Sequence, residues 1–239
     1  MNMLRWLCVV AIALAMTGCI KVDQTLTLHQ DGSGTLDMRY GMSEQAIAQV
    51  EAMEKMGQAM QEGGGEGLDM EADRPFDLDF DENKVREEFA AKGLEGVELV
   101  SATSETIDGW RYMEIKVSFE HLAALKQTDY FDGSELSLSK DAEGNYVLTQ
   151  RSTDHESSGE AEETDPQMLE QMAAMFAGMH IANRVVVPTE IVETNATEID
   201  GRSAAWIYDI EQDPTILNQL QNFDMRVVFS SQGASIAIP

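Results

Sequence analysis

The chain has 239 residues, of which 43% are hydrophobic, so it can bury the core of one large or two small domains. It carries 43 acidic and 16 basic side chains, which gives a formal net charge of -27. An acidic surface of this size repels nucleic acid and anionic lipid headgroups, so the charge excludes both as direct partners.

The first nineteen residues have the pattern of a secretory signal. Arg5 supplies the positive start, an apolar run extends from Trp6 to Met16, and small residues follow. The run is too short to span a bilayer, which needs about 20 apolar residues. Thr17-Gly18-Cys19 resembles the lipobox of bacterial lipoproteins, although Met16 stands where that motif usually has Leu.

The lipobox resemblance implies that residues 1–18 are a cleaved signal peptide and that Cys19 begins a mature domain over 19–239. The Cys19 sulfur would carry the two acyl chains (palmitate or similar) that stable membrane anchoring requires. Because Ile20 rather than Asp follows, the outer membrane of a Gram-negative cell envelope is favoured over the inner membrane. The alternatives are a signal peptide cut elsewhere, which leaves Cys19 a free thiol, and an uncleaved anchor. The only other cysteine, Cys8, lies in the signal, so no disulfide is expected.

The first third of the domain is expected to contain a hairpin and a helix. Val22–His29 and Thr35–Tyr40 alternate apolar and polar residues around a Gly-containing turn, which predicts a β-hairpin. A helix is expected from Ser43 to about Gln61. Residues 62–82 are acidic and rich in turn residues, so they are predicted to form a mobile loop.

The middle of the chain gives the clearest local signals. Asp81 is suited to cap a helix over Glu82–Lys92, which Gly93 would end. Val97–Ile107 and Trp110–Phe119 flank Asp108-Gly109, the strongest hairpin signal in the chain. A short helical piece is expected at Leu122–Lys126, and a further hairpin is expected from Ser134–Ser139 and Tyr146–Gln150.

The last third begins with a polar, acidic stretch at 153–165, which is predicted to be an exposed loop. Pro166 is expected to open a helix to about Met179, and Asp213-Pro214 a short helix to about Leu220. Strands joined by tight turns, with helices interspersed, predict an α+β fold, in which a few helices pack on a largely antiparallel sheet built from hairpins. The remaining strands are expected near Ile181–Val187, Glu190–Thr194, Ala204–Ile210 and Asp224–Ser230.

Two groups of residues have the composition of metal sites. Asp77, Asp79, Asp81 and Glu88 have the spacing of an EF-hand calcium loop, but Glu82 stands where that loop needs Gly, so an acidic loop before a capped helix is favoured. A stripe of methionines at helical spacing is expected to be core, with a pliable binding surface or a Cu(I) site as alternatives. Its members are Met168, Met172, Met175 and Met179, with a shorter series at Met53, Met56 and Met60.

No pattern typical of a catalytic site is present. His29, His121, His155 and His180 are scattered without metal-ligand spacing, and the sequence has no HExxH, GxSxG, P-loop or dinucleotide-binding motif. We therefore expect a protein that is not an enzyme, with no catalytic residues, no metal site and no cofactor.

Several short motifs of turn and strand residues follow one another along the chain in a particular order. They are Gly18-Cys19, Thr25-Leu26-Thr27-Leu28, Asp31-Gly32-Ser33-Gly34, Gly109-Trp110-Arg111 and the closing series Asn195, Gly201 and Trp206. Together they resemble the LppM-type domain of bacterial envelope lipoproteins. The resemblance implies an extracytoplasmic α+β binding module without established catalytic residues. Trp110 and Trp206 are expected to pack in its core.

The sequence thus predicts a membrane-anchored lipoprotein with a non-enzymatic role in the envelope, in which the domain binds a lipid or a partner protein. A deep apolar cavity would distinguish lipid binding. The alternative is a calcium- or copper-binding protein, or a metal-dependent enzyme, that uses the acidic loops. A purely structural role in envelope assembly is a third hypothesis.

Overall fold

The structure is a computed structural model that describes residues 20–48, 51–52, 80–131, 133–153, 178–210, 213, 216 and 222–238. Several predictions lie outside these residues: the signal peptide, Cys19, most of both acidic loops, the helix after Pro166 and every methionine of the two series except Met179. None of the helices within the described residues is long and apolar enough to cross a membrane.

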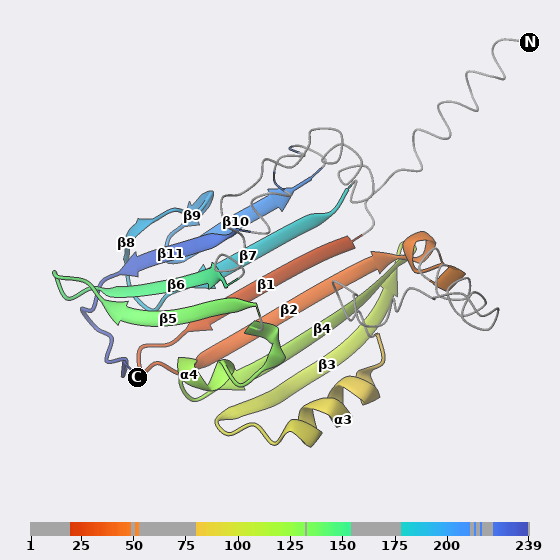
Figure 1. The fold of residues 1–239 in the computed structure, drawn as a ribbon, viewed down its shortest axis with the longest axis horizontal. Helices are drawn as coiled ribbons and strands as arrows, with labels where there is room; N and C mark the ends of the chain where they lie inside the picture. Colours follow the sequence, from red (N-terminus) through yellow and green to blue (C-terminus); the bar gives the residue numbers. More distant parts are fainter. Residues whose placement is uncertain are drawn as a thin grey trace, which may run out of the picture.

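Seven strands form a large sheet in the order β3-β4-β2-β1-β7-β10-β9 (Figure 1). Every neighbouring pair is antiparallel except β1 and β7, which run parallel. The strands are β1 (Ile20–Leu28), β2 (Gly34–Ser43), β3 (Val97–Ile107), β4 (Trp110–Phe119), β7 (His180–Val186), β9 (Glu198–Asp200) and β10 (Ser203–Asp209).

Four further strands form a small antiparallel sheet in the order β5-β6-β11-β8, which covers part of one face of the large sheet (Figure 1). They are β5 (Ser134–Lys140), β6 (Tyr146–Ser152), β8 (Ile191–Thr194) and β11 (Asp224–Phe229). The described helices are α3 (Glu82–Lys92), α4 (Leu122–Leu125), a 3-10 turn at Asp129–Phe131 and a helical segment at 44–48 and 51–52.

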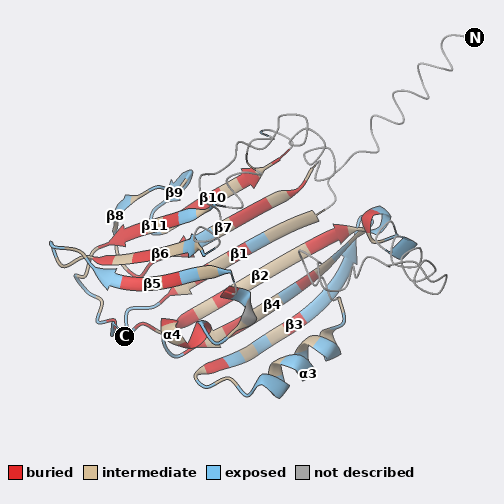
Figure 2. Cartoon of the chain, viewed as in Figure 1, coloured by how far each residue is buried: buried red, intermediate tan, exposed pale blue. Residues whose placement is uncertain are grey.

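The core lies between the two sheets, because alternate residues of facing strands point inward. Leu26 and Leu36 of the large sheet and Leu136 and Phe229 of the small sheet are each at most 2% exposed. Figure 2 shows the same alternation as red bands along the strands. Burial of each such side chain contributes about 1.5–3 kcal/mol. The opposite side of the large sheet, called the outer face here, carries the polar alternate residues, among them Asp23 and Asp37.

The helix and the hairpins that were predicted from residues close together in the sequence are confirmed. The first hairpin, the hairpin around Asp108-Gly109 and the helix over Glu82–Lys92 all form. The Asp81 side chain accepts hydrogen bonds from the amides of Asn83 and Lys84, and Gly93 ends α3 in the left-handed conformation, with φ 57°. The largely antiparallel pairing is also confirmed, and the α+β class holds only roughly, because the described residues contain many strands and few helices.

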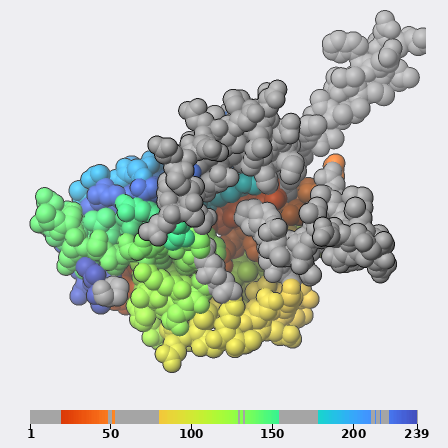
Figure 3. All heavy atoms as spheres, viewed as in Figure 1, coloured from red at the N-terminus to blue at the C-terminus, as the bar shows by residue number. Residues whose placement is uncertain are grey.

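The arrangement of the layers differs from the prediction. Among the described residues, a second sheet and the short helix α4 cover the first sheet, where only helices were expected, and the short strand β9 was not expected. The helix α3 has no buried residue and lies beside the edge strand β3 (Figure 1). Together they form one margin of the molecule, shown in yellow in Figure 3.

The helix α3 pairs with the backbone that β3 leaves open at the sheet edge. The Ser104 amide donates a hydrogen bond to Glu82 Oε1 at 2.7 Å, and Arg86 Nη2 donates to the Ala102 carbonyl. The unpaired backbone of an edge strand is a template for association with other strands. The side chains of α3 therefore cover part of this edge.

Candidate functional site

A small cavity lies between the two sheets. It has a volume of about 10 Å³ and lies where inward-pointing residues of both sheets meet, which is room for about one water molecule. An acyl chain does not fit in this cavity. The cavity is lined by Leu26, Leu136, Leu148, Gln150, Val185, Trp206, Met225 and Val227.

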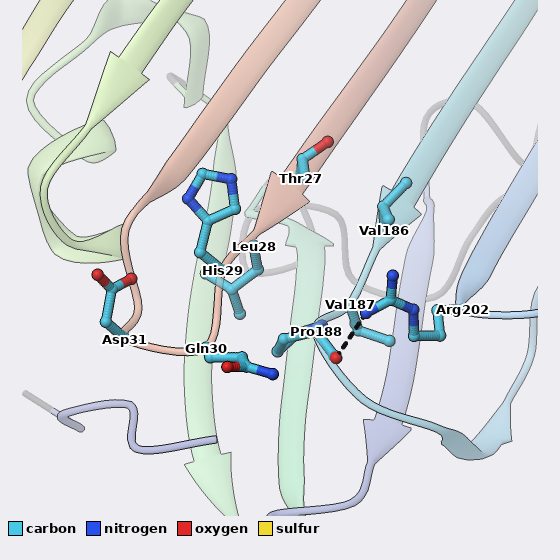
Figure 4. Close-up of a pocket in the computed structure, with 9 residues that line it drawn as sticks. All are labelled: Thr27, Leu28, His29, Gln30, Asp31, Val186, Val187, Pro188 and Arg202. Carbon is cyan, nitrogen blue, oxygen red and sulfur yellow. Dashed lines mark hydrogen bonds between the residues drawn. The ribbon is translucent and has the colours of Figure 1, made fainter. Parts of the chain in front are cut away.

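A larger pocket of about 500 Å³ opens where β1 and β7 end (Figure 4). Three connections form it: the turn between β1 and β2, the segment after β7 and the turn between β9 and β10. Val186 and Pro188 contribute apolar walls, while His29 and Arg202 stand on opposite sides. The full lining is Thr27, Leu28, His29, Gln30, Asp31, Val186, Val187, Pro188 and Arg202. We call it the terminal pocket.

Local hydrogen bonds hold the β1–β2 turn, which makes one wall of the terminal pocket. The His29 amide donates to the Ser33 carbonyl at 2.8 Å, and the Gly32 amide donates to the His29 carbonyl at 3.1 Å. Ser33 donates to Asp31 Oδ1 from both its amide, at 3.0 Å, and its hydroxyl, at 2.7 Å. The left-handed backbone of Gly32, with φ 91°, closes the turn.

These bonds set the charge of the turn. The hydrogen bonds from Ser33, with a smaller contribution from the nearby His29, hold the pKa of the Asp31 carboxyl below its ordinary value. The Asp31 carboxylate, which is ionised at neutral pH, thus accepts two hydrogen bonds within the turn.

The opposite wall depends on Arg202, which lies in the turn between β9 and β10. Its Nη1 atom donates to the Pro188 carbonyl at 2.7 Å, and the Val187 amide donates to the Arg202 carbonyl at 2.9 Å. These two bonds fix the segment after β7 against the turn. The guanidinium has further donors beyond the one used here, so it can also bind an anionic group.

His29, Ser33 and Asp31 are the residue types of a hydrolase triad, and here all three lie in one turn. In a triad the serine hydroxyl gives its proton to the histidine, and the carboxylate orients that histidine. Here the Ser33 hydroxyl lies 2.7 Å from Asp31 Oδ1, to which it donates, and 3.1 Å from His29 Nδ1. These contacts stabilise the β1–β2 turn.

The structure places few of the metal candidates. Asp81 uses its carboxylate as the cap of α3, and Glu88 pairs with Lys84 at 3.7 Å. Asp77 and Asp79 lie outside the described residues. Met179 is 4% exposed and packs in the core, as predicted for that methionine. Among the described residues, no group of three His, Cys, Asp or Glu side chains is placed to hold a metal ion.

The two tryptophans differ in their placement. Trp206 is 4% exposed and belongs to the core, as predicted. The prediction that Trp110 packs in the core is wrong, because its position in β4 puts it on the outer face, where Lys21 Nζ lies 4.1 Å from its ring centre. Alternation along the strand decides this: Phe119 and Val117 point inward, so Trp110 points outward.

The sequence did not identify the terminal pocket. His29 was one of four scattered histidines, and Arg202 stood only in a turn motif. Their proximity depends on the parallel pairing of β1 with β7, in which Thr27 lies opposite Val186. The turn residues at Asp31-Gly32 and Gly201-Arg202 were the one available signal, because turns that end neighbouring strands lie close together.

The fold and the pocket define a two-sheet β-sandwich with a surface pocket at one end of its strands. No protein-family model matches the chain, and no curated protein matches it. Among solved structures, the chain is similar to the NMR structure of the folded domain of the LppM protein of Mycobacterium tuberculosis. That similarity has a TM-score of 0.44 at 12% sequence identity and covers 92% of this chain and 96% of that one. At this level of similarity, the function of a residue in one protein cannot be assigned to a residue of the other.

Proposed function

We propose that the chain is a lipoprotein of the bacterial envelope, anchored through Cys19, with a sandwich that binds a ligand in the terminal pocket and does not transform it. The course of β1 carries this proposal. The strand begins at Ile20, next to the proposed lipid site, and ends at Leu28, in the pocket wall. A strand of nine residues spans roughly 30 Å, so the pocket would be presented well away from the anchoring membrane.

The pocket chemistry favours a small ligand with one anionic group and an apolar part. A volume of about 500 Å³ is in the usual range for small-molecule sites. Arg202 supplies a permanent positive charge, Thr27 a hydroxyl and His29 a ring nitrogen. The one acidic lining residue, Asp31, is already engaged by Ser33. Val186 and Pro188 provide the apolar contact, so a carboxylate or phosphate on a short apolar body fits this lining.

This assignment keeps the protein a binding module rather than an enzyme. The short hydrogen bond from the Ser33 hydroxyl to Asp31, at 2.7 Å, supports it, because a nucleophilic serine would direct its proton to a histidine. The cavity of about 10 Å³ between the sheets is too small for such a ligand, which favours a ligand held at the surface.

Anchoring is tested by labelling cells that express the full chain with an alkyne fatty acid. The wild-type protein should incorporate the label and fractionate with membranes, whereas Cys19→Ala should do neither. Cys8→Ala serves as the matched control, because that cysteine lies in the proposed signal. Equal labelling of the Cys19→Ala and wild-type proteins would contradict the anchor.

Ligand binding is tested by NMR titration of the ¹⁵N-labelled protein with acetate, inorganic phosphate and glycerol phosphate. The amides of Thr27, Val187 and Arg202 should shift, and Arg202→Gln should weaken the binding by about tenfold, as expected for loss of a charged hydrogen bond worth about 1.5 kcal/mol. Lys126→Gln, which removes the same charge from an exposed site elsewhere, should leave it unchanged. Shifts that are equally weak in both variants would contradict an anion site.

A further inference from the structure

The turn between β3 and β4 lies at the same end of the large sheet as the start of β1 (Figure 1). The register requires this: Ile20 pairs with Met42, Ser43 pairs with Trp110, and Trp110 pairs with Ile107. The proposed lipid site is the residue before Ile20. The β3–β4 turn is therefore the part of the sheet edge that shares this end with the anchor.

The side chains at this turn combine apolar, aromatic and cationic groups. Ile107 is 44% exposed and lies opposite Trp110 on the outer face. Trp110 stacks on Tyr112 with ring centres 6.0 Å apart, and Lys21 Nζ lies 4.1 Å from the Trp110 ring centre. Arg111, on the other face of the strand, places its guanidinium 5.8 Å from the ring centre of Phe80.

The turn is rigidly held. Asp108 and Gly109 both have left-handed backbone, with φ 51° and 76°, as a tight two-residue hairpin turn requires. The Glu44 amide donates to the Gly109 carbonyl at 2.9 Å, which ties the turn to the helical segment after β2. The exposed Ile107 is thus presented on a fixed support rather than on a loose loop.

We propose that Ile107, Trp110 and Tyr112, flanked by Lys21 and Arg111, form a membrane-contact tip that rests in the headgroup layer of the bilayer holding Cys19. This inference rests on the proposed anchor. Trp and Tyr are enriched at membrane–water interfaces, because one part of each ring is apolar and another is polar. Lys and Arg side chains reach from such positions to lipid phosphates.

A bilayer suits this surface better than a protein partner does. The strand β1 begins one residue after Cys19, so the anchor leaves no tether that would lift this end away from the membrane. In a chain with a net charge of -27, Lys21 and Arg111 balance the acidic Asp108 and Glu44 beside the tip. A third cation, Arg39, lies 4.0 Å from the Tyr112 ring centre and is paired with Glu105 and Glu114. The lipid surface that fits is zwitterionic, because a strongly anionic one would repel the rest of the domain.

Fluorescence quenching tests the tip in the complete acylated protein. After signal cleavage, Trp110 and Trp206 are the only tryptophans, and Trp206 is 4% exposed in the core. The protein is reconstituted in vesicles of phosphatidylcholine and phosphatidylethanolamine that carry a spin label at the headgroup. We expect at least twofold stronger quenching in the wild type than in Trp110→Phe, whose remaining Trp206 signal also shows that the variant is folded.

Two substitutions sharpen the test. Ile107→Asp should lower the Trp110 quenching at least twofold, whereas Val192→Asp, which changes a 58% exposed residue of β8 in the small sheet, should leave it unchanged. If the protein floats with the vesicles but the wild type and Trp110→Phe are quenched equally, membrane contact by the tip is contradicted, whereas anchoring through Cys19 is not. If the wild-type protein does not float with the vesicles, both the anchor and the tip are overturned.

Discussion

Trp206 Nε1 donates a hydrogen bond to Asn195 Oδ1 at 3.2 Å, which joins the large sheet to the segment that leaves the small sheet. The same Oδ1 accepts from the Arg226 amide at 2.9 Å, and Asn195 Nδ2 donates to the Asp224 carbonyl at 2.7 Å. Arg226 and Asp224 belong to β11, and Trp206 belongs to β10. One amide side chain therefore bridges both layers of the sandwich at the point where the chain crosses between them.

Replacement of Asn195 by Ala should destabilise the protein by about 1–3 kcal/mol, because the Trp206 indole in the core loses its acceptor. Asn195→Asp retains the acceptor for Trp206 but places a carboxylate oxygen against the Asp224 carbonyl oxygen, so we expect it to destabilise the protein as well. Urea unfolding followed by fluorescence measures both. Equal stability of Asn195→Ala and the wild type would show that the bridge contributes nothing.

Removal of the α3 side chains that bind the β3 edge should promote self-association. In the double variant Glu82→Ala/Arg86→Ala, the Ser104 amide and the Ala102 carbonyl lose their partners, and the edge can pair with another strand. Sedimentation velocity should then show dimers or larger species. The matched control is Lys84→Ala/Glu88→Ala, which removes the neighbouring pair within the same helix. Identical sedimentation of the two double variants would contradict a protective role.

The β1–β2 turn should respond to acid through Asp31. Its pKa lies below the ordinary value because of Ser33, so its contribution to stability is present above the unfolded-state pKa and is lost as pH falls through the lower folded-state value. Ser33→Ala should raise this pKa towards the ordinary value, and the contribution should then be lost at higher pH. Carboxyl ¹³C NMR titration measures the change.

Asp141 is the internal control for that titration. Partial desolvation raises its pKa, but hydrogen bonds from Asn145 and neighbouring amides outweigh this and hold the pKa below its ordinary value. Asp141 lies in a different hairpin turn, so Ser33→Ala should leave it unchanged. A parallel rise at both residues would indicate general loosening of the fold rather than loss of one hydrogen bond.

A buried hydroxyl helps to hold the C-terminal segment in place. Tyr146 is 2% exposed, and its hydroxyl accepts from the Ile236 amide at 2.9 Å and donates to the Ile236 carbonyl at 3.2 Å. Tyr146→Phe should cost about 1–2 kcal/mol and speed amide exchange at Ile236. Ser137→Ala, which removes a hydroxyl contact with Thr149 within the small sheet, is the control. Unchanged amide exchange at Ile236 in Tyr146→Phe would contradict the proposed role of the Tyr146 hydroxyl in holding the C-terminal segment.

The elements that the sequence predicted well are those set by neighbouring residues. The helix α3 begins after Asp81 and ends before Gly93, because a cap and a left-handed glycine act within one turn of the chain. The hairpin of β3 and β4 follows from Asp108-Gly109 in the same way.

The arrangement of the sheets depends on residues far apart in sequence, and local patterns do not encode it. Nothing in Lys21 or in His180 indicates that they begin a parallel pair. The alternation in β6 and β11 fits one sheet or two equally well, so the second layer was missed. The terminal pocket follows from the same long-range pairing, which explains why its residues looked unremarkable in the sequence.

The contacts between the C-terminal segment and the first hairpin also constrain the order of folding. The Ser235 amide donates to the Gln30 carbonyl at 2.7 Å, and a Cβ on Gly32 would lie 2.8 Å from the Ile236 side chain, so the last residues close over the first hairpin. Contacts between distant parts of a chain form slowly, because a long loop must be closed first. A chain that is synthesised from its N-terminus can therefore form the contacts of Gln30 and Gly32 with residues 235–236 only after about two hundred further residues have been added. The support that these contacts give to one wall of the terminal pocket thus comes late in folding.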